Sequence, residues 1–349
     1  MREGFLLDPE VAYFNHGGYG ACPVEVFDEY QRWQRELEHE PTQHFKRFAD
    51  STAVAREALA DFVGARVADL VFTPNATSAL NAVIRSMRIR PNEEILTTKH
   101  EYGAILRTLG FIRANVVLVE PEEIVGNISI RTRAVVVSHI TSPTALVLPV
   151  AEICAAARRA GVLSIVDGAH VPGHVPLDVS TVGADIYAGN CHKWLCAPKG
   201  AGFLWARPEH QDWIEPLVIS WGFHEDAGFG ERHGWQGTQD PAAYLTVPKA
   251  IEVHASFDVA GAARLADKAE SRLSQLGLRP LRGARSPLMR ALTVRHPDPA
   301  ELWRRLYDEH RVELPAYEWE EVTLVRVSVG PYNDEADVER LVDAMRALL

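Results

Sequence analysis

Short apolar runs alternate with amphipathic stretches over residues 56–205 of this chain. Apolar runs without polar alternation are typical of strands buried on both faces, and helices between them indicate a mostly parallel sheet. Pro149 and Gly161 mark the start and the end of one such helix. The alternation therefore predicts an α/β fold. The expected strands are 70–72, 95–96, 116–119, 134–137, 163–166 and 202–205, and the expected helices are 76–87, 102–112 and 149–160.

The pattern changes after Pro248, where one long helix is expected over 249–276. Single cores stop growing at about 250–300 residues, and the chain has 349. We therefore expect a large domain over 1–245, which includes a helix over 23–40, and a smaller C-terminal α+β domain over 246–349. The other elements expected in the smaller domain are strands near 288–294, 311–314 and 322–328, and helices over 299–310 and 334–348.

Charge and composition exclude several classes of partner. The formal net charge of -11 opposes attraction to phosphate backbones and to anionic lipid surfaces. No apolar run reaches the length that is needed to cross a bilayer. Residues 1–8 meet an acid where a secretory signal requires a longer apolar stretch. We therefore expect a cytoplasmic protein that binds neither nucleic acid nor membrane.

The cysteines and histidines do not form a recognisable metal site. Cys22, Cys154, Cys191 and Cys196 show no C-x-x-C spacing, and the 14 histidines show no His-Glu-x-x-His or comparable spacing. We expect free thiols and no bound metal.

Asp167 and Lys193 form the most informative pair in the sequence. Asp167 directly follows the apolar run at 163–166, and Lys193 lies in the next motif along the chain, Asn190 to Trp194. Lysine is rare here, because most of the 36 basic residues are arginine. Pyridoxal phosphate chemistry requires such a pair: a lysine forms a Schiff base with the cofactor, and an aspartate keeps the pyridine nitrogen protonated. The pair therefore predicts a pyridoxal phosphate site.

Other segments offer contacts for the same cofactor. Asn75 is placed to cap a helix whose first turn holds Ala76 and Thr77, and free N–H groups in such a turn can bind phosphate. Taken alone, these residues are better explained by an ordinary helix cap. Tyr102 can stack on the cofactor ring, and His139 and His170, both near strand ends, can hydrogen-bond its phenolic oxygen. For all three side chains, a structural role is the alternative.

These segments, taken together, resemble the class V aminotransferase family of fold-type I pyridoxal phosphate enzymes, and in particular its isopenicillin N epimerase-like branch. The matching residues extend over nearly the whole chain in the order that the family shows. They are 13–20, 75–77, 100–104, 138–144, 167–170, 190–195, 237–242 and 324–333.

The resemblance implies the fold-type I architecture and a role for each matching residue. Lys193 holds the cofactor, Asp167 pairs with its pyridine nitrogen, His170 lies near the phenolic oxygen, and Tyr102 stacks on the ring. Arg326 grips the substrate carboxylate through its planar fork. The remaining roles are phosphate binding by Ala76, Thr77 and His192, phosphate binding by Thr238 from the neighbouring subunit of a homodimer, and a place on the substrate side for Asn15 and His16.

The reaction stays open among several possibilities. We expect a homodimeric enzyme, with active sites at the interface, that acts on an amino acid as its small-molecule substrate by epimerisation through a carbanion. A C–S or other β-lyase and an aminotransferase are the alternatives, and a non-catalytic cofactor-binding protein is a further one. Epimerisation requires a second acid or base opposite Lys193, for which His16, His224 and Tyr102 are unranked candidates. Residues 312–319 contain no cysteine, which argues against the persulfide chemistry of the family's cysteine desulfurases.

Overall fold

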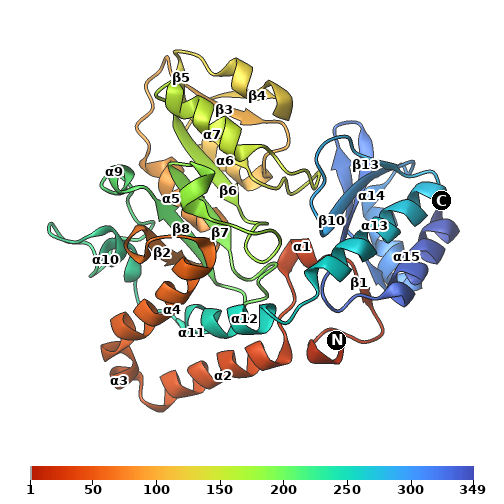
Figure 1. Cartoon of the computed structure of the whole chain (residues 1–349), viewed down its shortest axis with the longest axis horizontal. Coiled ribbons are helices and arrows are strands. Elements are labelled where there is room, and N and C mark those ends of the chain that lie inside the picture. The colour runs from red at the N-terminus through yellow and green to blue at the C-terminus, as the bar shows by residue number, and fades with distance from the viewer. Residues whose placement is uncertain (1) are drawn as a thin grey trace.

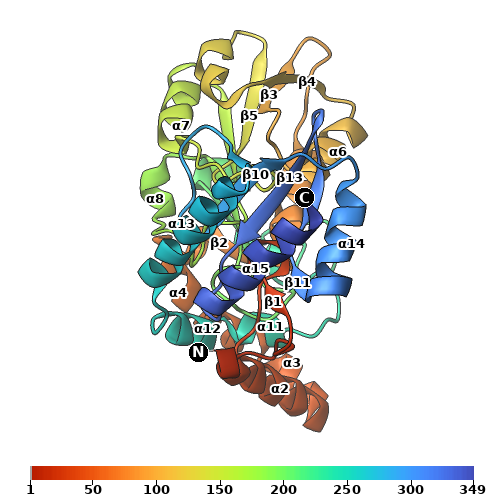
Figure 2. The same cartoon turned by 90° about the vertical axis from the view of Figure 1, so that its right-hand side faces the viewer.

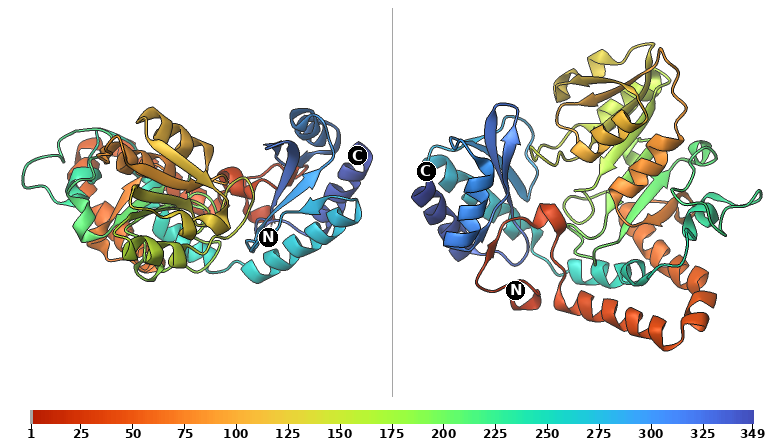
Figure 3. Two further views of the ribbon diagram at one scale, coloured as in Figure 1. Left: turned by 90° about the horizontal axis from the view of Figure 1, so that it is seen from above. Right: turned by 180° about the vertical axis from the view of Figure 1, so that it is seen from behind.

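The computed structural model describes residues 2–349, so Met1, the first residue of the expected large domain, lies outside the described residues. The chain forms a large and a small body, with the short helix α1 (His16–Tyr19) between them (Figure 1). Figure 3 shows the two bodies side by side from above and from behind. No helix among residues 2–349 is both long and apolar enough to cross a membrane.

A seven-stranded sheet forms the centre of the large body, in the order β2-β8-β7-β6-β5-β3-β4. All neighbouring strands are parallel except those next to β8, which runs antiparallel to both of its neighbours. This confirms the mostly parallel sheet. The strands are β2 (Leu70–Thr73), β3 (Glu94–Thr98), β4 (Asn115–Val119), β5 (Thr132–Ser138), β6 (Leu163–Gly168), β7 (Ile186–Asn190) and β8 (Gly202–Ala206).

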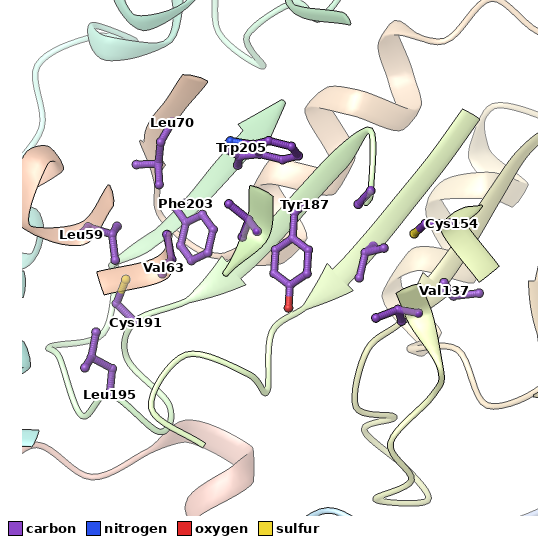
Figure 4. Close-up of a cluster of buried hydrophobic side chains, with 14 of the residues drawn as sticks. Leu59, Val63, Leu70, Val137, Cys154, Tyr187, Cys191, Leu195, Phe203 and Trp205 are labelled. Atoms are coloured by element: carbon purple, nitrogen blue, oxygen red, sulfur yellow. The ribbon is translucent and has the colours of Figure 1, made fainter. Parts of the chain in front are cut away.

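Helices cover both faces of this sheet, which explains why its strands read as continuous apolar runs. Val135 and Val137 of β5 pack in one core with α4 (Phe48–Val63) and α7 (Val150–Arg159). Ala134 and Val136 point the other way, to α5 (Ala76–Ser86) and α6 (Gly103–Phe111). Figure 4 shows the first of these cores, in which Tyr187, Phe203 and Trp205 of β7 and β8 lie between labelled side chains of α4 and α7.

Strand β7 was not among the apolar runs expected from the sequence. Its residues Ala188, Gly189 and Asn190 lack large apolar side chains. A Cβ atom at Gly189 would lie 2.4 Å from the ring of Phe203, so the close packing of β8 requires a small residue there. The weak apolar signal of β7 therefore has a packing cause.

The small body is a four-stranded antiparallel sheet with three helices against it (Figure 2). Its sheet has the order β12-β13-β10-β9, with β9 (Arg279–Pro280), β10 (Met289–Val294), β12 (Ala316–Trp319) and β13 (Val322–Ser328). The helices are α13 (Val259–Gln275), α14 (Pro299–His310) and α15 (Glu335–Leu348). Strands β9 and β12 are additions to the elements expected from the sequence.

The single helix expected over 249–276 is wrong, because the chain makes two helices there. Helix α12 (Val247–His254) ends before Asp258, whose side chain accepts the N–H of Gly261 at 2.7 Å and caps α13. Val247 and Ala250 of α12 belong to the core of the large body, whereas α13 packs in the core of the small one. The division at residue 245 stays a prediction.

The N-terminal segment joins the two bodies. Strand β1 (Ala12–Tyr13) pairs in parallel with β11 (Val312–Glu313), and Ala12 and Phe14 are buried in the small body's core. After α1, the long helix α2 (Val24–His39) runs along the large body beside α11 (Ala242–Leu245) and α12 (Figure 1). The remaining short helices are η1 (Arg2–Gly4), α3 (Pro41–Lys46), η2 (Val67–Asp69), η3 (Pro121–Glu123), η4 (Val125–Asn127), α8 (Val179–Val182), α9 (Pro208–Gln211) and α10 (Phe229–Gly234).

Candidate active site

The carboxyl ends of β5, β6 and β7 meet at one edge of the large sheet, where ligands of open α/β sheets bind. Asp167 lies at the end of β6, and the loop after β7 carries Lys193. They line one cavity of about 520 Å³. The cavity brings together seven of the residues singled out in the sequence: Asn75, Thr77, Tyr102, Asp167, His170, His192 and Lys193.

Backbone packing fixes the loop that holds Lys193. Gly20 has a φ of +68°, and a Cβ atom there would lie 2.0 Å from the backbone oxygen of His192. His16 lies below the same loop, and its Nε2 is 3.1 Å from the backbone oxygen of Lys193. Gly20 and His16 of the N-terminal segment therefore pack against the backbone of the loop that carries Lys193.

The amine of Lys193 is suited to attack a carbonyl carbon. Burial and the positive charge of Arg326 lower the pKa of Lys193 to about 7, although Asp167 acts in the opposite direction. A large share of the lysine is then a neutral amine at neutral pH, which is the nucleophilic form.

His170 links Lys193 to a buried tryptophan. The Nε1–H of Trp194 donates to His170 Nδ1 at 3.3 Å, and His170 Nε2 lies 3.2 Å from Lys193 Nζ. Burial, together with the charges of Lys193 and Arg326, lowers the pKa of His170 well below its ordinary value. Because the neutral ring accepts at Nδ1, we assign its proton to Nε2, which faces the cavity side of the ring.

Asp167 is buried, and its Oδ1 accepts the N–H of Ala169 at 2.8 Å. Burial raises the pKa of Asp167, whereas the Ala169 N–H and the charge of Lys193 lower it. Burial and the negative charge of Asp167 raise the pKa of a second buried carboxyl, Glu101. Glu101 lies in the matching segment from His100 to Ala104, but no role was predicted for it from the sequence.

The residues that were expected to bind phosphate are not all free to do so. Thr77 lines the cavity, whereas the N–H of Ala76 already donates to Asn190 Oδ1 at 2.8 Å. Asn75 caps α5 by accepting the N–H of Ser78 at 2.8 Å. His192 lines the cavity while its Nδ1 is 3.1 Å from the backbone oxygen of Ala201.

His139 and Thr238 lie away from this cavity. The Nδ1 of His139 is 3.0 Å from the hydroxyl of Tyr187, so the ring has a structural partner, and its neighbours Ser138 and Ile140 line the cavity instead. Thr238 is exposed in the segment that follows α10. Its role across a dimer interface stays a prediction.

A second cavity, of about 480 Å³, adjoins the first and shares Tyr19, Tyr102, Ser142 and Lys193 with it. Its other side comes from the small body and includes Arg326 of β13. The two cavities thus form one cleft between the bodies, with Lys193 at the junction.

Arg326 is a buried arginine that forms no salt bridge with any residue from 2 to 349. Its Nη1 donates to the backbone oxygen of Ser142 at 2.6 Å and to the Ser142 hydroxyl at 3.1 Å, and its Nη2 is 3.5 Å from Asn15 Oδ1. Its Nε has no hydrogen-bond partner in the described chain. Buried charges are normally paired, so this guanidinium is suited to receive an anion.

Asn15 holds Arg326 from the N-terminal segment. Its Nδ2 donates to Glu313 Oε1 at 3.0 Å, and the same carboxylate accepts the Nε1–H of Trp303 at 3.2 Å. Asn15 lines the second cavity, as expected for the substrate side. His16 differs from that expectation: it is fully buried behind the lysine loop, with Nδ1 3.1 Å from the hydroxyl of Tyr332, and it lines neither cavity.

These residues fit pyridoxal phosphate. The first cavity offers an amine for an aldehyde, a carboxylate for a pyridine nitrogen, an imidazole N–H, and a threonine at a helix start for phosphate. When bound, this cofactor withdraws electrons from the substrate Cα.

Comparison with known proteins agrees with this assignment. The family model for Aminotransferase class-V matches residues 21–341. Isopenicillin N epimerases of Streptomyces clavuligerus and Amycolatopsis lactamdurans are 33% and 35% identical to the chain, and the alignments cover 99% of it and 97% of each relative. A putative L-cysteine desulfhydrase 1 of Oryza sativa subsp. japonica is 31% identical over 71% of the chain and 58% of that relative.

Solved structures share the fold. A mutant of C-DES with glycine covalently linked to the PLP cofactor superimposes with a TM-score of 0.87, at 22% identity and 99% coverage of both chains. The fold-type I architecture expected from the sequence is thereby confirmed. The chain belongs to the class V aminotransferase family and is a pyridoxal phosphate-dependent enzyme.

Proposed function

We propose that the enzyme epimerises an amino-acid substrate at Cα, as the isopenicillin N epimerases that it resembles are named for doing. The observation that carries the proposal is the unpaired, buried Arg326, which lines the same cleft as Lys193. A carboxylate bound by Arg326 places the Cα of an amino acid toward the lysine. In this proposal Arg326, from the small body, binds the substrate, and Lys193, from the large body, moves the proton across the same cleft.

Each site residue has a proposed task. The amine of Lys193 binds the cofactor and then moves the Cα proton, while His170 donates from Nε2 toward the same place. Asp167, which is buried in the lining of the first cavity, holds a negative charge there. Tyr102 provides an aromatic face at the entrance, where 43% of its surface is exposed.

Epimerisation requires a second proton carrier, and the positions of the candidate side chains support some of them more than others. His16 is enclosed behind the lysine loop, and His224 is 3.0 Å from Glu231 on an exposed segment that lines neither part of the cleft. Tyr102 lines both cavities, and so does Tyr19, which the sequence analysis did not single out. We propose a tyrosine hydroxyl, from Tyr102 or Tyr19, as the second carrier.

The size and lining of the cleft favour a large substrate over cysteine. The second cavity has a volume of about 480 Å³ and is lined by aromatic rings from both bodies as well as by Arg326. Its aromatic residues are Tyr19, Tyr102, Trp303, Tyr317 and Trp319. A β-lyase acting at a C–S bond is the second candidate, supported by the desulfhydrase relatives.

One experiment separates these reactions. The holoenzyme is incubated in deuterated water with a panel of L- and D-amino acids of increasing side-chain size, and the products are identified by chiral chromatography and mass spectrometry. Epimerisation predicts the opposite enantiomer with one deuterium at Cα. A 2-oxo acid with ammonia indicates a lyase, and a 2-oxo acid formed only with an amino acceptor indicates an aminotransferase.

Two single variants provide the matched comparison. A two-carrier epimerase that loses one carrier still exchanges the Cα proton of one enantiomer but no longer inverts it. We therefore expect this behaviour in either Tyr19→Phe or Tyr102→Phe, and not in both. Full inversion by both variants would contradict a tyrosine carrier.

We also propose a homodimer in the cytoplasm. The loop before α10 projects from the large body in Figure 1 and exposes apolar side chains, including 91% of Trp221, 59% of Ile219 and 51% of Val218. An exposed apolar segment of this kind favours coverage by a second subunit. Thr238 lies farther along the same region, which supports its proposed contact with the partner's site.

A further inference from the structure

Glu101 is a buried carboxyl at the wall of the active site, with 3% of its surface exposed. Its Oε1 accepts the backbone N–H of Tyr102 at 2.8 Å and the hydroxyl of Ser138 at 2.7 Å. Its Oε2 is buried and has no hydrogen-bond partner in the described chain. A carboxylate without a cation and with one unpaired oxygen is costly to bury.

The sheet places this carboxyl close to Asp167. Ser138, which donates to Glu101, lies directly opposite Asp167 in the register of β5 and β6. Burial and the negative charge of Asp167 raise the pKa of Glu101 to about 8, whereas its hydrogen bonds from Ser138 and Tyr102 act in the opposite direction. Two adjacent carboxyls in a buried site favour one shared negative charge over two.

Among residues 2–349, no cation forms a salt bridge with Glu101. Lys99 is 2.6 Å from Glu120, and His100 is 2.7 Å from the hydroxyl of Thr144. Arg326 and Lys193 line the same cavity as Glu101, but Arg326 donates to the backbone oxygen of Ser142, and Lys193 Nζ lies 3.2 Å from His170 Nε2. A pyridine nitrogen held by Asp167 would neutralise the charge of Asp167 and would leave Glu101 without a cation.

We propose that Glu101 is a positioning residue that works as a neutral acid: it holds Tyr102 and Ser138 through Oε1 and leaves the site's negative charge on Asp167. This inference rests on the proposed roles of Asp167 and Tyr102, and it is independent of which reaction the enzyme catalyses.

Infrared spectroscopy of the holoenzyme tests the proposal directly, because a protonated carboxylic acid has a carbonyl band that a carboxylate lacks. We expect a carbonyl band at pH 6 to 7 that is lost at higher pH and is missing in Glu101→Gln. Glu94, a buried carboxyl at the other end of β3 that pairs with Arg131 at 2.9 Å, provides the control. Glu94→Gln should leave the band unchanged.

Two further variants shift the titration of the same band in opposite directions. Asp167→Asn removes the charge that raises the pKa of Glu101, so the band should disappear at lower pH. Ser138→Ala removes a hydrogen bond that lowers this pKa, so the band should persist to higher pH. These variants test Glu101 even if Glu101→Gln does not fold.

The visible spectrum and the kinetics give the functional comparison. A glutamine retains an Oε1 acceptor and resembles the neutral acid, so Glu101→Gln should keep the cofactor band and a kcat within about threefold of wild type. Glu101→Ala should lose both hydrogen bonds and change kcat more than KM. No carbonyl band assignable to Glu101, or a Glu101→Gln variant as defective as Glu101→Ala, would overturn the neutral-acid role, whatever product the enzyme forms.

Discussion

Replacing Arg326 by lysine keeps the charge on the substrate side of the cleft but removes the planar fork. In the structure, Nη1 of Arg326 donates to the backbone oxygen of Ser142. Its Nη2 makes one long contact, of 3.5 Å, with Asn15 Oδ1, and its Nε has no hydrogen-bond partner in the described chain. A carboxylate can therefore be received on the Nε and Nη2 edge by two parallel bonds. A lysine ammonium replaces at most one of them.

The expected loss is one hydrogen bond to a charged group, about 1.5–3 kcal/mol. At about 1.4 kcal/mol for each factor of ten, KM should rise roughly 10- to 150-fold in Arg326→Lys. The cofactor spectrum should not change, because Arg326 lies in the second cavity and not in the first. Steady-state kinetics with the best substrate of the amino-acid panel, together with visible spectra, measure both quantities.

Arg340→Lys is the matched control, since Arg340 is an arginine of the small body that donates to the backbone oxygen of Glu10 on the surface. Its kinetics should equal those of wild type. If Arg326→Lys also has an unchanged KM for every α-amino acid that is turned over, carboxylate binding by Arg326 is refuted.

Three other variants or conditions give further predictions. Asp167→Asn should bind the cofactor but lose roughly 10²–10³ in kcat, because a buried charge that stabilises the transition state is removed; near-normal turnover would remove this role. Cofactor-free protein should take up pyridoxal phosphate faster as the pH rises through about 7, because the pKa of Lys193 is lowered from the ordinary lysine value of 10.5 and the amine is neutral above it. Growth of the visible band measures this rate, and a midpoint near 10.5 would contradict a buried nucleophile. Mixing Lys193→Ala with Thr238→Trp should restore at most about a quarter of wild-type activity if subunits exchange at random; demonstrated exchange without recovery would show that Thr238 does not act across the interface.

Much of the large body could be predicted from the sequence because its strands are buried on both faces. β5 shows this, since consecutive valines supply both cores and leave an uninterrupted apolar run. Strand β7 could not be predicted in this way, because its close contact with Phe203 requires a glycine at position 189, which interrupts the apolar run. The break between α12 and α13 was also missed, since Asp258 is an unremarkable helix residue until its side chain is seen to cap α13.

The chemistry of the site was predictable where a residue type has few other uses. Lys193 and Asp167 could be predicted from the residues themselves, because a rare lysine and a carboxylate after a strand suit one cofactor, whereas Arg326 was predicted only from the family resemblance. All three line the cleft. His16 and His139 were harder to place, because a histidine in a matching motif can equally bind a ligand or support a loop. Here the two rings have Tyr332 and Tyr187 as partners.

Glu101 and Tyr19 show what pattern reasoning misses. Their importance comes from neighbours that are distant in the sequence: Glu101 contacts Ser138 from another strand, and Tyr19 is brought into the cleft by the N-terminal segment. Only the assembled sheet edge reveals a second carboxyl beside Asp167.

Lys193 is assigned as the residue that holds the cofactor. Lys199 is the alternative to exclude, because it lines the same cavity and burial lowers its pKa as well. The most direct measurement is borohydride reduction of the holoenzyme, followed by proteolysis and mass spectrometry of the lysine peptides. We predict a phosphopyridoxyl group on Lys193 alone, and no reducible cofactor in Lys193→Ala. A reduced cofactor on Lys199, or one that persists in Lys193→Ala, would contradict the assignment of the active site.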